Sequence, residues 1–121
     1  MAKISSILRS AQDDRLMFWC PGCDGPHMVG VGPGDGPRWS WNSDVDKPTF
    51  NPSVLVTGMH WVPPVTPENA EQFRADPWVQ QQAKSICHSF VQEGRMVFLA
   101  DCTHELAGFT VDIPPFPEGW E

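Results

Sequence analysis

The clearest chemistry in this sequence lies in its four cysteines. Cys20 and Cys23 are separated only by Pro21 and Gly22, which favour a tight turn. Two thiolates at this spacing can bind one tetrahedral ion, with Zn–S distances of about 2.3 Å. Redox dithiols share the spacing, but they open a helix in a βαβ unit, which the Gly and Pro residues after Cys23 do not favour. The motif therefore predicts half of a zinc site.

The other half is predicted from a β-hairpin. Glu93 and Gly94 are flanked by alternating apolar residues, so that residues 85 to 102 are expected to form two antiparallel strands joined by a two-residue turn. In that register Cys87 and Cys102 share one face as diagonal neighbours. Together with the first pair they give a closed four-cysteine zinc site, and closed sites of this kind are structural.

Histidines near these cysteines leave the ligand set open. His104 follows Cys102 by two residues and is the expected substitute ligand, while His27 also lies close to the first pair. His88 is expected on the opposite face of its strand, with Asp101 diagonal to it. That arrangement is either a buried histidine hydrogen-bonded to a carboxylate or a functional pair.

Short strands must position these residues. The chain of 121 residues fits one domain, 1–121, and its thirteen Pro and ten Gly indicate many turns. We therefore expect a small β-rich (α+β) fold, in which zinc staples an antiparallel sheet of short strands. Strands are predicted near 15–19, 27–31, 38–42, 53–57, 85–92, 95–102 and 109–113.

A short helical insertion is predicted within residues 58–84. Thr66-Pro67 and Asp76-Pro77 each place an N-cap residue before a proline, which is typical of a helix start. The helices are expected to end near Ala75 and Lys84. Helix should be confined mainly to residues 67–84.

Charge and hydropathy narrow the possible partners and location. The net charge of −7 and the scattered basic residues disfavour nucleic-acid binding, because phosphate binding needs grouped Lys and Arg. The sequence contains neither a signal peptide nor an apolar run long enough to span a membrane. We expect a protein of the host cytoplasm or of a virion, not secreted, with a protein partner and no membrane.

Six short motifs follow one another in a characteristic order. They are Phe18-Trp19-Cys20-Pro21-Gly22-Cys23, Trp39-Ser40-Trp41-Asn42, Pro48-Thr49-Phe50-Asn51-Pro52-Ser53, Cys87-His88-Ser89-Phe90, Asp101-Cys102-Thr103-His104 and Leu106-Ala107-Gly108. This order resembles a family of small, uncharacterised bacteriophage and prophage proteins, which automatic annotation sometimes labels "ammonia monooxygenase", a label that does not suit a chain with no membrane span. The resemblance covers roughly residues 16 to 114 and implies a phage context and a shared Cys/His constellation.

Three functions fit these observations. The first is a structural or interaction protein, a virion component or an accessory protein, in which zinc fixes a scaffold that binds a protein partner. The second is a zinc-dependent hydrolase that uses His88, Asp101, His104 or Glu105 for acid–base chemistry. The third is a zinc-ribbon-like module that binds nucleic acid, which the negative charge disfavours.

Overall fold

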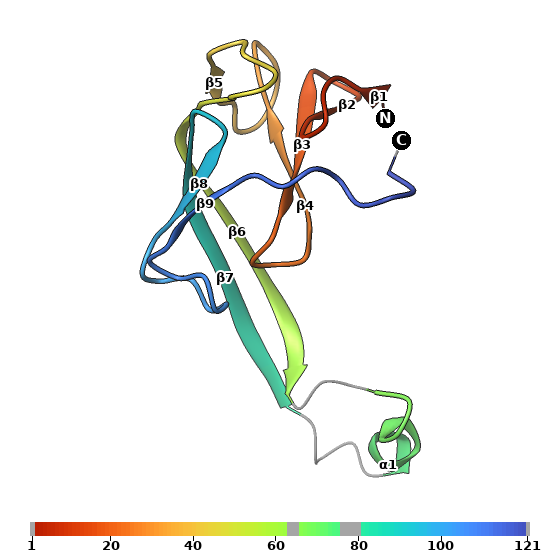
Figure 1. Cartoon of the computed structure of the whole chain (residues 1–121). Helices are drawn as coiled ribbons and strands as arrows, with labels where there is room; N and C mark the ends of the chain where they lie inside the picture. The colour runs from red at the N-terminus through yellow and green to blue at the C-terminus, as the bar shows by residue number, and fades with distance from the viewer. Residues whose placement is uncertain (1, 63–65, 76–80, 121) are drawn as a thin grey trace.

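Two antiparallel sheets make up most of the fold (Figure 1). The computed structural model describes residues 2–62, 66–75 and 81–120. In the first sheet the strands follow chain order: Ala2–Lys3 (β1), Arg9–Ala11 (β2), Arg15–Cys20 (β3) and Gly25–Gly30 (β4). The second sheet also follows chain order: Ser40–Trp41 (β5), Phe50–Val62 (β6), Gln81–Gln92 (β7), Arg95–Phe98 (β8) and Thr110–Asp112 (β9).

The predicted β-rich class is confirmed, and so is the central hairpin. β7 pairs with β8 in the predicted register, with Gln92 facing Arg95 across the turn at Glu93 and Gly94. Glu93 and Gly94 both have positive φ, 49° and 78°, as this kind of turn requires. The second strand of the hairpin is shorter than predicted, because β8 ends at Phe98 and the chain to Cys102 follows a turn.

The helix prediction is confirmed for the first helix, which lies within 67–84 and ends at Ala75 as predicted, and is wrong for the residues just before Lys84. The helix α1 covers only Ala70–Ala75, and Gln81 to Lys84 belong to β7. Gly58 to Val62 likewise continue β6, so the ends of the predicted 58–84 insertion are strands that pair with each other. Long-range pairing in the β6–β7 ladder has overridden the local helix signal before Lys84. The second helix start, Asp76-Pro77, lies outside the described residues.

The inner faces of the two sheets share one hydrophobic core. Phe18 of β3 stacks on Phe50 of β6, with ring centroids 6.0 Å apart, and both side chains are fully buried. Strand alternation explains which residues face inward. The buried apolar residues are Leu16, Phe18, Cys20 and Val29 from the first sheet, and Phe50, Val54, Cys87, Val91, Met96 and Phe98 from the second.

Three of the four cysteines, Cys20, Cys87 and Cys102, belong to this core, and the first two lie on strands of the two different sheets. Cys20 is the last residue of β3 and continues the inward series of Leu16 and Phe18. Cys87 begins a similar series on β7 with Ser89 and Val91, all of them buried. The described part of the chain has no helix long enough and apolar enough to cross a membrane.

We predict that Phe50→Ala lowers the free energy of unfolding by about 3–5 kcal/mol, because it leaves a cavity beside Phe18 in the shared core. Phe109→Ala is the matched control, since 61% of that side chain is exposed. Its effect should stay within about 0.5 kcal/mol. Urea unfolding followed by tryptophan fluorescence measures both, and equal losses in the two variants would contradict a core formed jointly by the sheets.

Candidate active site and metal centre

One Cys/His group joins the two sheets and is positioned to bind a metal ion. It consists of Cys20, Cys23, His27 and Cys87, whose candidate ligand atoms all lie within 4.8 Å of one another. The Sγ atoms of Cys20 and Cys87 are 3.8 Å apart. Two sulfurs on one tetrahedral zinc, each at about 2.3 Å, are separated by about 3.8 Å. The geometry of this group therefore suits a tetrahedral ion.

The thiols of this group interact strongly with one another. The hydrogen bond with the Cys87 thiol lowers the pKa of Cys20 to about 4, against the opposing effect of burial. The same hydrogen bond raises the pKa of Cys87, whose proton is shared with the Cys20 sulfur. Burial is the largest cause that raises the pKa of Cys23 to about 11. Metal binding at this group must therefore displace protons from Cys23 and Cys87.

His27 completes the group from β4. Its side chain is buried, with 6% exposed, and its Nε2 atom has no hydrogen-bond partner among the described residues. The ring also packs edge-on against Phe18, with centroids 5.8 Å apart. A buried imidazole nitrogen without a partner is costly unless something binds it, and a metal ion held by the three neighbouring thiols would do so.

A second group shares Cys87 and adds Cys102 and His104. The His104 ring packs over the turn of the Cys20–Cys23 motif, where any side chain at Gly22 would collide with it. His104 Nδ1 accepts a hydrogen bond from the Leu106 N–H at 3.2 Å. A neutral ring that accepts at Nδ1 carries its proton on Nε2, and that buried N–H, like Nε2 of His27, has no hydrogen-bond partner among the described residues. His104 could bind a metal through Nε2 only if that proton left and the hydrogen bond at Nδ1 changed. The predicted ligand role of His104 stays a prediction.

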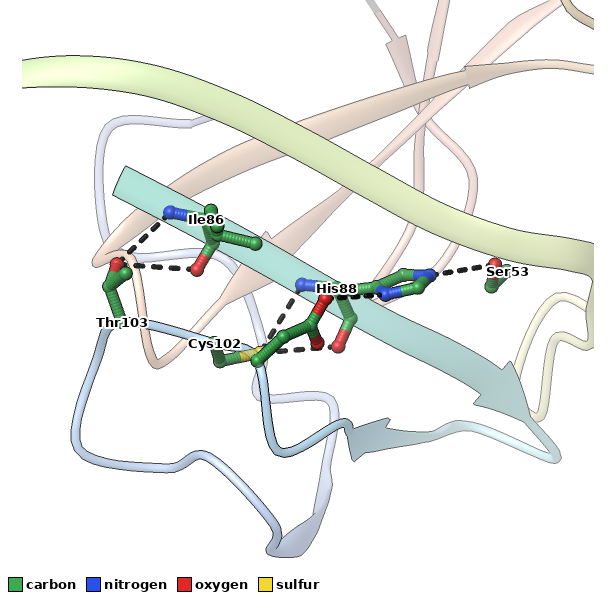
Figure 2. Close-up of polar contacts among 6 residues, drawn as sticks. Ser53, Ile86, His88, Cys102 and Thr103 are labelled. Carbon is green, nitrogen blue, oxygen red and sulfur yellow. Dashed lines mark hydrogen bonds and ion pairs between the residues drawn. The ribbon is translucent and has the colours of Figure 1, made fainter. Parts of the chain in front are cut away.

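On the opposite face of β7, three side chains form a continuous hydrogen-bonded chain (Figure 2). Ser53 Oγ lies 3.0 Å from His88 Nε2, and His88 Nδ1 lies 3.1 Å from Asp101 Oδ2. The predicted contact between His88 and Asp101 is thus confirmed. With Ser53 it gives the hydroxyl, imidazole and carboxylate of a Ser-His-Asp triad. The His88 side chain is 24% exposed and that of Asp101 is 52% exposed.

A bulge in β6 positions Ser53. Phe50 pairs with Val91 and Val54 pairs with Ser89, so β6 has two more residues than β7 between these pairs. The indole Nε1 of Trp39 donates to the main-chain carbonyl of Ser53 at 3.2 Å and anchors the bulged segment. Extra residues of this kind redirect side chains out of the regular ladder. Here the Ser53 hydroxyl reaches His88, which directly faces Leu55.

A second irregularity, after β8, positions Asp101. The Leu99 N–H donates to the His88 carbonyl and the Thr103 N–H donates to the Ile86 carbonyl, each at 2.9 Å. Between these two bonds the loop has three residues where β7 has one. The surplus is taken up by a turn, closed by the Cys102 N–H on the Leu99 carbonyl at 3.2 Å. Asp101 lies within this turn and reaches the His88 ring from there.

Ser53 was not recognisable as a functional residue from the sequence alone. It is the last residue of the Pro-rich motif Pro48-Thr49-Phe50-Asn51-Pro52-Ser53, and no nucleophile motif surrounds it. The signal that could have found it was the expected His88–Asp101 pair, because such a pair can activate a hydroxyl on a neighbouring strand. Ser53, at the start of the predicted strand 53–57, is a candidate for that hydroxyl.

Comparison with known proteins identifies the family of this chain. Residues 2–99 match the family model described as "Bacterial ubiquitination-like system serine protease (BubE)". Comparisons with curated proteins and with solved structures found no match. The match includes Ser53 and His88 and ends two residues before Asp101, and it gives no support to the phage context, which stays a prediction. Since the match spans most of its length, this chain belongs to the BubE family.

Proposed function

We propose that this protein is a serine peptidase that hydrolyses an amide bond in a protein substrate. The observation that carries the proposal is the chain of hydrogen bonds from Ser53 through His88 to Asp101, at 3.0 and 3.1 Å. The family description supports it independently, because it names a serine protease of a bacterial ubiquitination-like system. The substrate would accordingly be a protein of such a system.

Each triad residue has a distinct role in this proposal. His88 Nε2 removes the proton from Ser53 Oγ as the oxygen attacks the substrate carbonyl carbon, and then gives that proton to the leaving amine. The remaining ester on Ser53 is hydrolysed by water, with His88 again accepting and returning the proton. Asp101 accepts the Nδ1–H of His88, which keeps Nε2 unprotonated and aimed at the hydroxyl.

The surface beside the triad suits an extended, partly apolar segment of substrate. Leu55 directly faces His88 across the β6–β7 ladder and is 56% exposed. The side chain of Ser53 is half-buried, so that a segment lying over Leu55 could reach it. An exposed apolar side chain next to the reacting groups gives the substrate a contact that excludes water.

We propose that the Cys/His group of Cys20, Cys23, His27 and Cys87 binds zinc as a structural ion. Three thiolates and one imidazole are a typical structural zinc set and leave no position for water. Cys87 and His88 are consecutive residues of β7, one buried among the candidate ligands and the other in the triad. An ion held there would fix β7 against β3 and supply no chemistry to Ser53.

The other functions considered from the sequence have less support. The family description names a protease, which does not favour a purely structural role in a virion. A closed ligand set does not favour a zinc-activated water, so a zinc-dependent hydrolase is less well supported than a serine peptidase. The net charge of −7 continues to disfavour nucleic-acid binding.

Ser53→Ala should abolish covalent labelling by a fluorophosphonate probe, because only an activated hydroxyl attacks the probe's phosphorus. His88→Ala should abolish it too. Ser10→Ala is the matched control, a serine of β2 in the first sheet, and should label as the wild type does. Labelling is followed by mass spectrometry of the intact protein. A wild type that takes up no probe, or one modified at another serine, would refute the proposed nucleophile.

Asp101→Asn should lower kcat for p-nitrophenyl acetate hydrolysis strongly and leave the thermal midpoint nearly unchanged. The amide cannot hold the required tautomer of His88, and the loss in a well-studied triad of this kind is about 10⁴-fold. Because Asp101 is half exposed here, a smaller loss, on the order of 10²- to 10³-fold, is expected. Asp112→Asn, which removes an exposed carboxylate paired with Arg95, is the control. Equal kcat in both variants would exclude Asp101 from the triad.

The purified protein should contain one zinc ion per molecule, measured by elemental analysis. Cys20→Ser, Cys23→Ser and His27→Asn should each lose the ion, whereas His88→Ala and His104→Asn should retain it. Chelation should unfold the protein, since zinc binding is coupled to folding at such sites. Zinc retained in His27→Asn and lost in His104→Asn would show that the second Cys/His group supplies the fourth ligand.

A further inference from the structure

We propose that Cys102 is a positioning residue for catalysis, whose thiol holds the main chain of His88 in place within the triad. The inference rests on the proposed serine peptidase function and concerns the same site. It assigns to Cys102 a role other than that of a metal ligand. Figure 2 shows the Cys102 side chain against β7 at His88, beside the loop that supplies Asp101.

The sulfur contacts both main-chain polar groups of His88. The His88 N–H donates to Cys102 Sγ at 3.2 Å, and the thiol donates to the His88 carbonyl at 3.2 Å. The Cys102 side chain is buried, with 8% exposed, so water does not replace these contacts freely. A buried thiol that both accepts and donates is fully satisfied at this position.

The turn that carries Asp101 explains why a sulfur is needed there. In a regular antiparallel ladder the His88 N–H would donate to the carbonyl of the facing residue, Leu99. That carbonyl instead accepts from the Cys102 N–H and closes the turn. The same turn brings the Cys102 sulfur to the His88 N–H. The thiol thus takes the place of the carbonyl that the ladder loses when Asp101 is turned toward the imidazole.

The hydrogen bonding also distinguishes this role from metal ligation. A thiolate bound to metal has no proton to donate, and placing it 3.2 Å from the His88 carbonyl would bring two negative groups together. The group of Cys20, Cys23, His27 and Cys87 already offers four ligands without Cys102.

As a consequence, the Cys102 side chain couples the position of His88, the proposed general base, to the position of Asp101. Cys102 follows Asp101 directly in the chain and clamps the residue whose ring Asp101 must reach. Loss of the thiol would leave the His88 N–H without a partner on that side, with only the Leu99 N–H still bound to the His88 carbonyl at 2.9 Å, and would let the imidazole shift relative to Ser53. Misplacement of a catalytic group by about 1 Å can cost on the order of 10² in rate.

The test compares Cys102→Ala and Cys102→Ser with the wild type, using p-nitrophenyl acetate hydrolysis, zinc content and the thermal midpoint. Cys102→Ala should lower kcat by on the order of 10²-fold, with KM and zinc content unchanged, since the thiol acts on geometry and not on substrate binding. Cys102→Ser should recover about tenfold of the loss, because a hydroxyl can also accept and donate. This rescue would not follow from a ligand role.

Thr103→Val is the matched control within the same loop. It removes the Oγ1 bonds to Ile86 and keeps the Thr103 N–H bond to the Ile86 carbonyl, so it loosens the loop without touching His88. Its kcat should stay close to that of the wild type. Three outcomes would overturn the proposal: unchanged kcat in Cys102→Ala, zinc loss in Cys102→Ser, or an equal loss of kcat in Thr103→Val.

The measurement separates this inference from the proposed function. If the wild type neither reacts with the fluorophosphonate probe nor hydrolyses the ester, the peptidase function itself fails. If the wild type is active and Cys102→Ala matches it, only the role of Cys102 fails. If Cys102→Ala does not fold, the Cys102→Ser variant tests the proposal. A wild-type zinc content together with a kcat between those of the wild type and His88→Ala supports the positioning role of Cys102, and loss of zinc refutes it.

Discussion

Consecutive residues of a β-strand point to opposite faces of the sheet, and the whole site depends on this constraint at Cys87 and His88. Cys87 is buried among the candidate metal ligands, and His88 lies in the triad on the other face. Neither residue can move along the strand without displacing the other. The long β6–β7 ladder, which pairs Val54 to Val62 with β7, fixes that register.

Two interruptions of regular pairing then bring the partners of His88 to it. A bulge in β6 presents Ser53, and a turn after β8 presents Asp101, each through two residues more than the facing strand contains. Both irregular segments have compensating hydrogen bonds: the Trp39 indole donates to one, and in the other the Cys102 sulfur accepts from the His88 N–H. The regular sheet supplies rigidity, and its local exceptions supply the geometry of the site.

The parts of the structure that could be predicted from sequence are those determined by short-range patterns. The alternation around Glu93 and Gly94 gave the hairpin register, and this register put His88 near Asp101. The proline and N-cap signals predicted helix up to Lys84. The residues before Lys84 form part of β7 instead, because they pair with β6. The position of Ser53 depends on a bulge and on Trp39, fourteen residues away in the chain, and no local pattern encodes that contact.

The same limit applies to the metal ligands. The sequence predicted one zinc site made of all four cysteines, because the Cys20–Cys23 motif and the two hairpin cysteines each offer a pair of thiol ligands. In the structure the cluster divides into two groups that share Cys87, and His27 enters the first of them. The sequence left His27 as one of several candidate ligands, and the pairing of β3 with β4, in which Phe18 and His27 face each other, is what brings it into the first group.

In the proposed peptidase, the exposure of Asp101 would link catalysis to the presence of a large substrate. With 52% of its side chain open to water, the carboxylate attracts the imidazolium of His88 through a medium of high dielectric constant. A protein that settles over this face would expel that water and strengthen the attraction at the moment of reaction. Small molecules leave the surroundings of the carboxylate wet. The attraction between Asp101 and His88 would therefore be strongest with a macromolecular substrate bound. The substrate would then provide the apolar surroundings that this small fold does not supply around Asp101.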